Sequence, residues 1–290
     1  MEFETKDFSL SISSLSGILT LRSRKFPETS FQTRLNTTVN FLEKDLSLLE
    51  KSWSILETEE PTIQEAPAGP MRLITFRLAT TIKEVQLIVR CGLSISEPMA
   101  FFQHELVNGS QKELILKRLD LLDIPTGQLH LGKVSTQDPV FYSNGWQSWS
   151  STGSYGLDDR QNMSILGRFQ NPMVVNPGTP QPKKTNTFTG DMYGLVGDKD
   201  TRIGLLAGFL SQKGQFGSLE AGFNPEPTLK VWANGDDSHI PAGSSAQTDW
   251  LAVSFVNLAD PDPLGGYLAT VGRLHGVPQD QAVPVGWCSW

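Results

Sequence analysis

Residues 83–90, Lys-Glu-Val-Gln-Leu-Ile-Val-Arg, decide the fold class. Val85, Leu87 and Val89 occupy every second position, so in an extended chain their side chains lie on one face. Residues 72–78 alternate in the same way. A period of two over short stretches is typical of strands with one buried face, and it indicates a β-rich protein.

The surrounding chain adds further strands, separated by turn residues. The first 35 residues alternate weakly and contain Gly17 and Pro27, which predicts an opening pair of strands. Asn108-Gly109 stands between two apolar runs and predicts a β-hairpin that joins residues 105–107 to 113–122. More strands are expected at residues 128–134, 203–210, 228–233 and 250–256. Many short strands separated by turn residues predict an all-β fold, a large antiparallel β-sandwich or supersandwich.

Four segments depart from the strand pattern. Apolar residues at a spacing of three and four favour an amphipathic helix within residues 36–53: Val39, Leu42, Leu46, Leu49 and Trp53. Residues 59–70 are rich in proline and predict a loop, and residues 234–237, Asn-Gly-Asp-Asp, read as a turn. A helix is expected from its cap, Asp262, to Leu274.

The net charge excludes some classes of partner. The 290-residue chain carries a formal charge of −7, and an acidic surface repels phosphate backbones, so we expect no nucleic-acid partner. No apolar run is long enough to cross a bilayer, and the N-terminus lacks the basic and apolar regions of a signal peptide. We therefore expect no membrane partner and a cytoplasmic location, with Cys91 and Cys288 as reduced, buried thiols.

The sequence offers few catalytic motifs. Its four histidines lie far apart, and no phosphate-binding glycine loop or nucleophile elbow occurs, so we expect no metal and no cofactor. Asp158-Asp159 and Asp236-Asp237 are adjacent carboxylate pairs. A glycosidase needs two carboxyl groups opposed across a cleft, about 5 to 9.5 Å apart. We assign neither pair a catalytic role.

The densest chemistry lies in residues 141–153, Phe-Tyr-Ser-Asn-Gly-Trp-Gln-Ser-Trp-Ser-Ser-Thr-Gly. A sugar presents apolar C–H faces and polar edges, so its binding needs flat aromatic rings beside directional hydrogen-bonding groups. Trp146, Gln147 and Trp149 are therefore candidate sugar-binding residues. The alternative is that both indoles fill the sandwich core, where large aromatic side chains are most often found.

The last seven residues, Pro284 to Trp290, read Pro-Val-Gly-Trp-Cys-Ser-Trp. This run resembles the first barrel strand of the α-galactosidase family that includes the raffinose synthases, which often shows Gly-Trp-Cys, then Ser or Thr, then Trp. Residues 146–150, 204–211 and 240–243 also look like that family's sandwich. The resemblance is close over roughly the second half of the chain and general over the first half.

The resemblance implies an N-terminal β-sandwich, a linker helix and a (β/α)8 catalytic barrel. We expect the sandwich at residues 1–258, the linker helix and loop at 259–283, and the start of a truncated barrel at 284–290. Trp287 and Trp290 would then begin the first barrel strand, near the substrate pocket.

The resemblance also implies a role for the sandwich, which lends an aromatic side chain to that pocket, with Trp146 or Trp149 as the candidate. The family's nucleophile and its acid/base are aspartates on later barrel strands. No catalytic residue is therefore expected in this chain, and the chain alone should be inactive.

The implied parent enzyme cleaves terminal α-galactosides with retention. Its expected partners are an α-galactoside oligosaccharide and its own catalytic barrel, and the chain could also form a homo-oligomer. Two alternatives stay open: transfer of galactose between sugars, as in raffinose synthases, and a free-standing carbohydrate-binding or structural sandwich.

Overall fold

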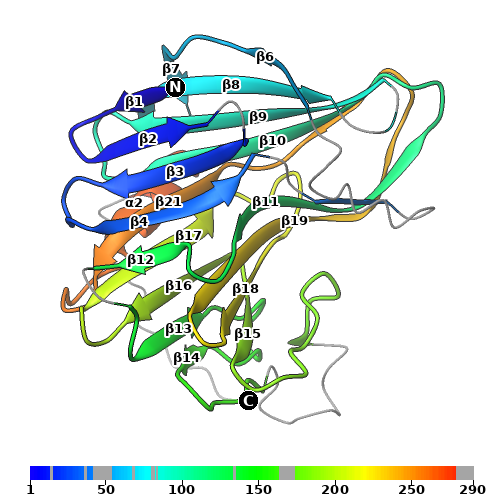
Figure 1. The fold of residues 1–290 in the computed structure, drawn as a ribbon. Helices are drawn as coiled ribbons and strands as arrows, with labels where there is room; N and C mark the ends of the chain where they lie inside the picture. Colours follow the sequence, from blue (N-terminus) through cyan, green and yellow to red (C-terminus); the bar gives the residue numbers. More distant parts are fainter. Residues whose placement is uncertain are drawn as a thin grey trace.

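The computed structural model describes residues 1–13, 16–35, 38–41, 54–66, 69–79, 82, 84–132, 135–162 and 174–278. Antiparallel strands and one helix make up the regular structure of this part of the chain, which confirms the predicted all-β sandwich. Figure 1 shows two smaller sheets, one above the other, against a larger sheet.

The larger sheet has eleven strands and forms one layer. Its strands, in spatial order, are β14 (Gly153–Tyr155), β13 (Pro139–Ser143), β16 (Tyr193–Asp198), β17 (Ile203–Phe209), β21 (Leu251–Asn257), β10 (Ala100–Asn108), β9 (Val85–Ser94), β8 (Gly69–Ala79) and β6 (Ser54–Thr58). In addition, β20 (Ser245–Gln247) pairs with β10, and β7 (Thr62–Ala66) pairs with β8.

The opposite layer consists of two five-stranded sheets. One runs β1 (Glu2–Glu4), β2 (Phe8–Ile12), β3 (Ile18–Ser23), β4 (Thr29–Arg34) and β12 (Leu129–Leu131). The other runs β15 (Thr187–Asp191), β18 (Gly217–Phe223), β19 (Pro227–Ile240), β11 (Leu114–Ile124) and β5 (Val39–Phe41).

The main core lies between the two layers. In β2 the period of two is visible directly, because Phe8, Leu10 and Ile12 are buried while the serines between them are half-buried. Phe31 of β4 packs on Phe102 of β10 with ring centroids 6.4 Å apart. Full burial of such side chains contributes about 1.5–3 kcal/mol each, so the alternating pattern accounts for most of the attraction between the layers.

The predicted hairpin at Asn108-Gly109 is wrong, because β10 and β11 belong to different sheets. The side chain of Asn108 is fully buried, and its Nδ2 donates to the carbonyl oxygens of Lys112 and Ile240 at 2.8 and 2.9 Å. Gly109 donates its N–H to the Glu84 carbonyl at 2.9 Å, and a Cβ on it would lie 2.5 Å from that oxygen. The pair therefore turns the chain from one layer to the other.

Three further predictions need correction. Val39–Phe41 is a strand rather than the start of a helix, because it adds to the edge of the smaller sheet beside β11; residues 42–53 lie outside the described part of the chain. Residues 62–66 form a strand where a loop was expected, since the prolines flank this segment and leave its backbone free to pair with residues 69–73 of β8. The opening pair of strands is in fact part of a four-stranded run, β1 to β4.

Residues 234–237 do not form a turn between strands but a bulge inside β19. Arg118 pairs with Asn234 and Leu116 with Ser238, so residues 235–237 face only Lys117 on β11. Asp236 and Asp237 take up the extra length with positive φ angles of 49° and 53°. Bulges re-aim side chains and are frequent beside functional sites.

The helix α2 (Gly265–Leu274) confirms the helix expected near residues 262–274. Its N-cap is Leu264 rather than Asp262, because the chain first makes a tight turn in which the N–H of Gly265 bonds the Asp262 carbonyl at 3.3 Å. The helix ends before Gly276, whose φ of +64° suits a glycine. Tyr267, on the buried face, donates its hydroxyl to the Phe209 carbonyl at 2.6 Å and fixes α2 to the outer face of the larger sheet.

A buried histidine also links the layers. His104 on β10 is 1% exposed, and its Nδ1 lies 3.0 Å from the carbonyl oxygen of Asp120 on β11. Because a carbonyl only accepts, Nδ1 carries a hydrogen. Burial lowers the pKa of His104 from 6.5 to about 4.

This histidine predicts an acid-sensitive fold. Its folded pKa is depressed, so its contribution to stability is present above about pH 6.5 and is lost as the pH falls towards 4, by about 3 kcal/mol in all. Urea unfolding at pH 7 and pH 4 should show this loss in the natural protein, and His104→Gln should reduce the pH dependence by about that amount. An equally steep pH dependence in the variant would contradict the assignment.

Candidate functional site: an aromatic loop beside a polar cavity

The loop at residues 144–152 connects β13 to β14 and is fixed at its base. The carbonyl of Asn144 accepts from the N–H of Asp191 at 2.8 Å, and Asn144 Nδ2 donates to the Asp191 carbonyl at 3.0 Å. The N–H of Gly145 donates to Thr152 Oγ1 at 3.0 Å and closes the loop. These bonds join the loop to the end of β15, across the two layers.

Gln147 shapes the loop from within. Its Oε1 accepts the N–H of Trp149 at 3.1 Å, and its carbonyl accepts the N–H of Ser150 at 2.9 Å. Ser150 in turn donates its Oγ to the Val174 carbonyl at 2.5 Å. The side chain of Gln147, which was predicted to bind sugar, therefore stabilises a tight turn within the loop. Trp146 precedes this turn and Trp149 lies in it.

Neither indole belongs to the main core. The side chain of Trp149 is 54% exposed. Trp146 is half-buried and its ring lies against Phe216, with centroids 5.4 Å apart. The Nε1 atom of Trp146 is buried and has no hydrogen-bond partner. A buried unpaired N–H costs about 1–3 kcal/mol, so this donor calls for a ligand or an ordered water.

Trp146 lines a cavity of about 700 Å³. The size lies within the range of small-molecule sites, about 300–1,000 Å³. Two other buried atoms without partners line it, Gln212 Nε2 and Gln215 Oε1. The remaining walls come from β11, the segment at 176–180 and the bulge of β19, with Lys117, Arg118, Asn176, Asp236 and Asp237 among the lining residues.

A buried polar network supports the floor of the cavity. Asp191 accepts from Asn176 Nδ2 at 2.9 Å and from Thr179 Oγ1 at 2.6 Å. Asn234 donates to Ser218 Oγ at 2.7 Å. Burial raises the pKa of Asp191, although Thr179 and Asn176 oppose the shift by bonding the carboxylate. Satisfied networks of this kind give buried positions one geometry.

Arg118 adds a fixed charge to the wall of the cavity. Its guanidinium carbon lies 3.9 Å from the ring centroid of Trp232, and its Nε contacts Asp120 Oδ1 at 2.5 Å. Burial raises the pKa of Asp120, and the charge of Arg118 opposes that shift. The two contacts hold Arg118 in place beneath the β19 bulge.

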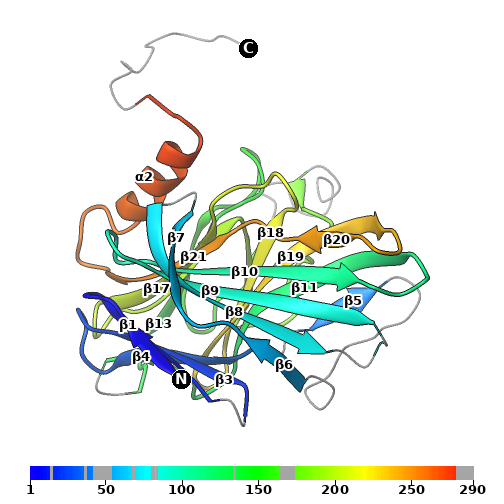
Figure 2. The ribbon, with the colours of Figure 1, turned by 90° about the horizontal axis from the view of Figure 1, so that it is seen from above.

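The helix α2 ends next to a loop that lines the cavity. His275 Nε2 lies 3.0 Å from the carbonyl of Leu210, the residue that opens the loop at 210–216. Gln212, Gln215 and Phe216 follow in that loop. Figure 2 shows α2 on the opposite side of the molecule from β1 and β4. The end of the described chain and the cavity loop are thus neighbours.

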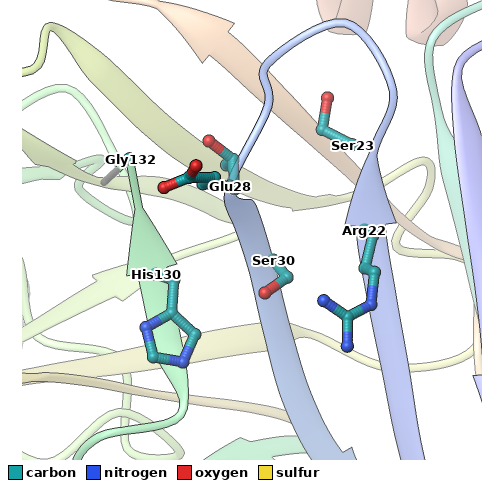
Figure 3. A pocket seen from close by; sticks show the side chains of 7 residues that line it. Arg22, Ser23, Glu28, Ser30, His130 and Gly132 are labelled. Atoms are coloured by element: carbon teal, nitrogen blue, oxygen red, sulfur yellow. The ribbon is translucent and has the colours of Figure 1, made fainter. Parts of the chain in front are cut away.

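A second hollow lies on β3, β4 and β12. Figure 3 shows Arg22 and His130 on either side of Ser30, in agreement with the strand register. The hollow has a volume of about 360 Å³, and Glu28 and Gly132 lie at its edge. It has no aromatic wall, and Arg22 and His130 are exposed. It is therefore a weaker candidate for sugar binding than the cavity at Trp146.

The residues predicted to bind sugar lie in different surroundings in the structure. Trp146 lines the cavity, Trp149 stands exposed on the same loop, and Gln147 bonds within the loop. Trp287 and Trp290 lie outside the described residues. Sequence reasoning missed the wall formed by the loop at 210–216, whose only signal is a cluster of amides and an aromatic residue after a strand, Gln212 to Phe216.

No protein-family model matches the sequence, and a search of curated proteins gives no match. Solved structures do match. The chain aligns over 95% of its length with 41% of an α-galactosidase from Lactobacillus brevis, with a TM-score of 0.56 and 8% identity. It aligns over 96% with 43% of a family 36 α-galactosidase from Geobacillus stearothermophilus solved with raffinose, with a TM-score of 0.56 and 10% identity.

The chain also aligns over 95% of its length with 39% of an α-N-acetylgalactosaminidase from Bifidobacterium bifidum, with a TM-score of 0.57 and 9% identity. This chain has the α-galactosidase-type β-sandwich fold. The resemblance expected from the sequence is therefore confirmed at the level of the fold. This α-galactosidase-type sandwich spans about two fifths of the length of the solved chains that it matches.

The network beneath the cavity predicts a specific pH effect. The folded pKa of Asp191 is raised, so its carboxyl favours folding most when protonated, near or below its ordinary value of 3.8, and that advantage is lost as the pH rises through the raised pKa. Asp191→Asn keeps an oxygen for Asn176 and Thr179 and has no proton to lose. Its stability relative to the natural protein should therefore increase from pH 4 to pH 7 in urea unfolding. A loss of more than about 2 kcal/mol at pH 7 would show that the carboxylate charge is needed.

Proposed function

We propose that this chain is the non-catalytic N-terminal domain of a retaining glycoside hydrolase that acts on terminal α-galactosides. In this proposal the sandwich packs on a catalytic (β/α)8 barrel, and its loop at residues 144–152 forms part of the wall of the sugar pocket. The resemblance of residues 284–290 to a first barrel strand and the shared fold with α-galactosidases support the proposal.

One observation carries the sugar-binding role. Trp146 lines a polar cavity, and its Nε1 is buried without a hydrogen-bond partner. A residue buried only for stability would bond that N–H, as Trp232 does by donating to Asn234 Oδ1 at 3.0 Å. A sugar hydroxyl would accept from Trp146, and the exposed face of Trp149 offers a surface for the C–H side of a sugar ring.

The position of α2 supports the packing on a barrel. Residues 259–283 are the proposed linker, and its helix ends beside the loop that lines the cavity. A domain that follows this linker would start next to the cavity. Trp287 and Trp290 would then approach the same pocket from the barrel side.

The residues that carry out the reaction would lie in the barrel. A retaining mechanism requires two carboxyl groups about 5 to 5.5 Å apart, one as nucleophile and one as acid/base. The sandwich would bind and orient the sugar and exclude water. Whether the parent transfers galactose to water or to another sugar depends on the acceptor side of the pocket, and both outcomes use the same wall.

The isolated chain should be inactive. We expect the purified 290-residue protein to give only background hydrolysis of an aryl α-galactoside, because the proposed catalytic pair is not in this chain. Activity that follows the protein through repurification, and that disappears in a variant with Asp236→Asn and Asp237→Asn, would overturn this expectation.

In the full-length enzyme, Trp146→Ala should lower kcat/KM for an aryl α-galactoside at least tenfold and change the melting temperature little. The expected cost is that of a lost ring contact and one hydrogen bond, about 1.5–3 kcal/mol. Phe26→Ala is the matched control, because Phe26 is a half-buried aromatic residue on the β3–β4 turn, away from the cavity. It should leave kcat/KM unchanged.

The opposite pattern would assign the loop a structural role. If Trp146→Ala and Trp149→Ala both unfold early, at a cost of about 3–5 kcal/mol, and the folded fraction keeps normal specific activity, the indoles stabilise the fold and do not bind sugar. A reading frame that stops at residue 290 would favour the free-standing carbohydrate-binding sandwich.

A further inference from the structure

The cavity has a second wall that the role of the aromatic loop does not explain. This wall, which we call the glutamine wall, consists of Gln212, Gln215 and Phe216 from the loop before β18, together with the β19 bulge at residues 235–237. Phe216 is 43% exposed and packs on Trp146, so the wall begins where the aromatic loop ends.

The glutamine wall presents a donor and an acceptor that are buried and unused. Gln212 Nε2 can donate, Gln215 Oε1 can accept, and neither has a partner. Together with Trp146 Nε1 they make two donors and one acceptor without partners, all on residues that line one cavity. A hydroxyl group both donates and accepts, so neighbouring hydroxyls on a sugar match this set better than a carboxylate or phosphate, which only accepts.

The loop holds these groups in a fixed geometry. Gln215 Nε2 donates to the Gln247 carbonyl at 3.2 Å, which leaves the oxygen of the same amide as the unused atom. Asp249 accepts the N–H of Gly214 at 3.0 Å and also contacts the hydroxyl of Ser211. A polar group that is already oriented loses less freedom when a ligand binds.

The charges at the wall favour a neutral ligand. Lys117 and Arg118 line the cavity together with Asp236 and Asp237, so the positive and negative groups balance. Arg118 is already held by Asp120 and the face of Trp232. An anion at this wall would lie near two carboxylates, Asp236 and Asp237, and Lys117 would be the cation left to bind it.

The wall is also open to solvent at its edge, because Asp236, Asp237 and Phe216 are exposed. An enzyme that removes a terminal sugar encloses that sugar and leaves the rest of the chain at the rim. The cavity of about 700 Å³ has room for more than one hexose ring.

We propose that the glutamine wall binds the leaving-group part of an oligosaccharide, and that Gln212 and Gln215 make the parent enzyme prefer oligosaccharide α-galactosides over small aryl α-galactosides. The inference rests on the proposed function, because the leaving group is defined by the bond that the parent cleaves.

The test is a comparison of two substrates in the full-length enzyme. The double variant Gln212→Leu and Gln215→Leu should lower kcat/KM for raffinose about tenfold, which corresponds to the loss of two hydrogen bonds. The same variant should change kcat/KM for an aryl α-galactoside less than twofold. Gln137→Leu, at an exposed glutamine between β12 and β13, is the control and should change neither value.

The outcomes separate the two proposals. If the unmodified enzyme cleaves neither substrate, the proposed function fails and the inference fails with it. If the double variant treats both substrates like the natural enzyme, or loses both equally, the inference is overturned and the proposed function stands. Should the variant fold poorly, ¹⁵N NMR of the natural 290-residue chain with raffinose decides: the side-chain signals of Gln212 and Gln215 should shift, and shifts confined to the indoles would overturn the inference.

Discussion

The structure depends on keeping polar groups satisfied where the chain passes from the larger sheet to the smaller ones. β10 ends at Asn108, whose buried amide bonds the backbone of the opposite layer, and His104, four residues earlier on the same strand, bonds β11. Apolar burial supplies most of the attraction between the layers. The side-chain bonds to backbone carbonyls add specific contacts from β10 to β11 and β19, and both of these strands line the cavity.

The sequence predicted the features that depend on local pattern. Alternation over residues 83–90 predicted β9, and an apolar stripe of period 3.6 predicted α2, because in both the buried face is a property of the segment itself. The hairpin at Asn108-Gly109 was wrong because a turn signal says that the chain reverses but not which sheet receives it. Partner strands are chosen by contacts far apart in sequence, such as those between β11 and β19.

The candidate site was also predicted only in part from the sequence. The mixture of indoles, amide and hydroxyls in residues 141–153 pointed to the aromatic loop, although the structure shows Gln147 shaping the turn. The rest of the cavity could not be predicted, because Gln212 and the β19 bulge reach it from segments more than sixty residues away in the sequence. The bulge itself reads as a turn in sequence, since Asn-Gly-Asp-Asp suits both, and only the pairing of Arg118 with Asn234 and of Leu116 with Ser238 distinguishes them.

The buried network, the two loops and the helix α2 are all grouped around or near the cavity at Trp146. A buried network around Asp191 supports the cavity floor, the aromatic loop and the loop before β18 form its walls, and α2 ends beside the loop before β18. The most direct test is a crystal structure of the proposed full-length enzyme with 1-deoxygalactonojirimycin bound. We expect the indole of Trp146 or Trp149 to lie in van der Waals contact with the inhibitor, about 4 Å away. An inhibitor bound in the barrel with both indoles more than about 10 Å from it, well beyond any contact distance, would show that the aromatic loop is not part of the sugar pocket.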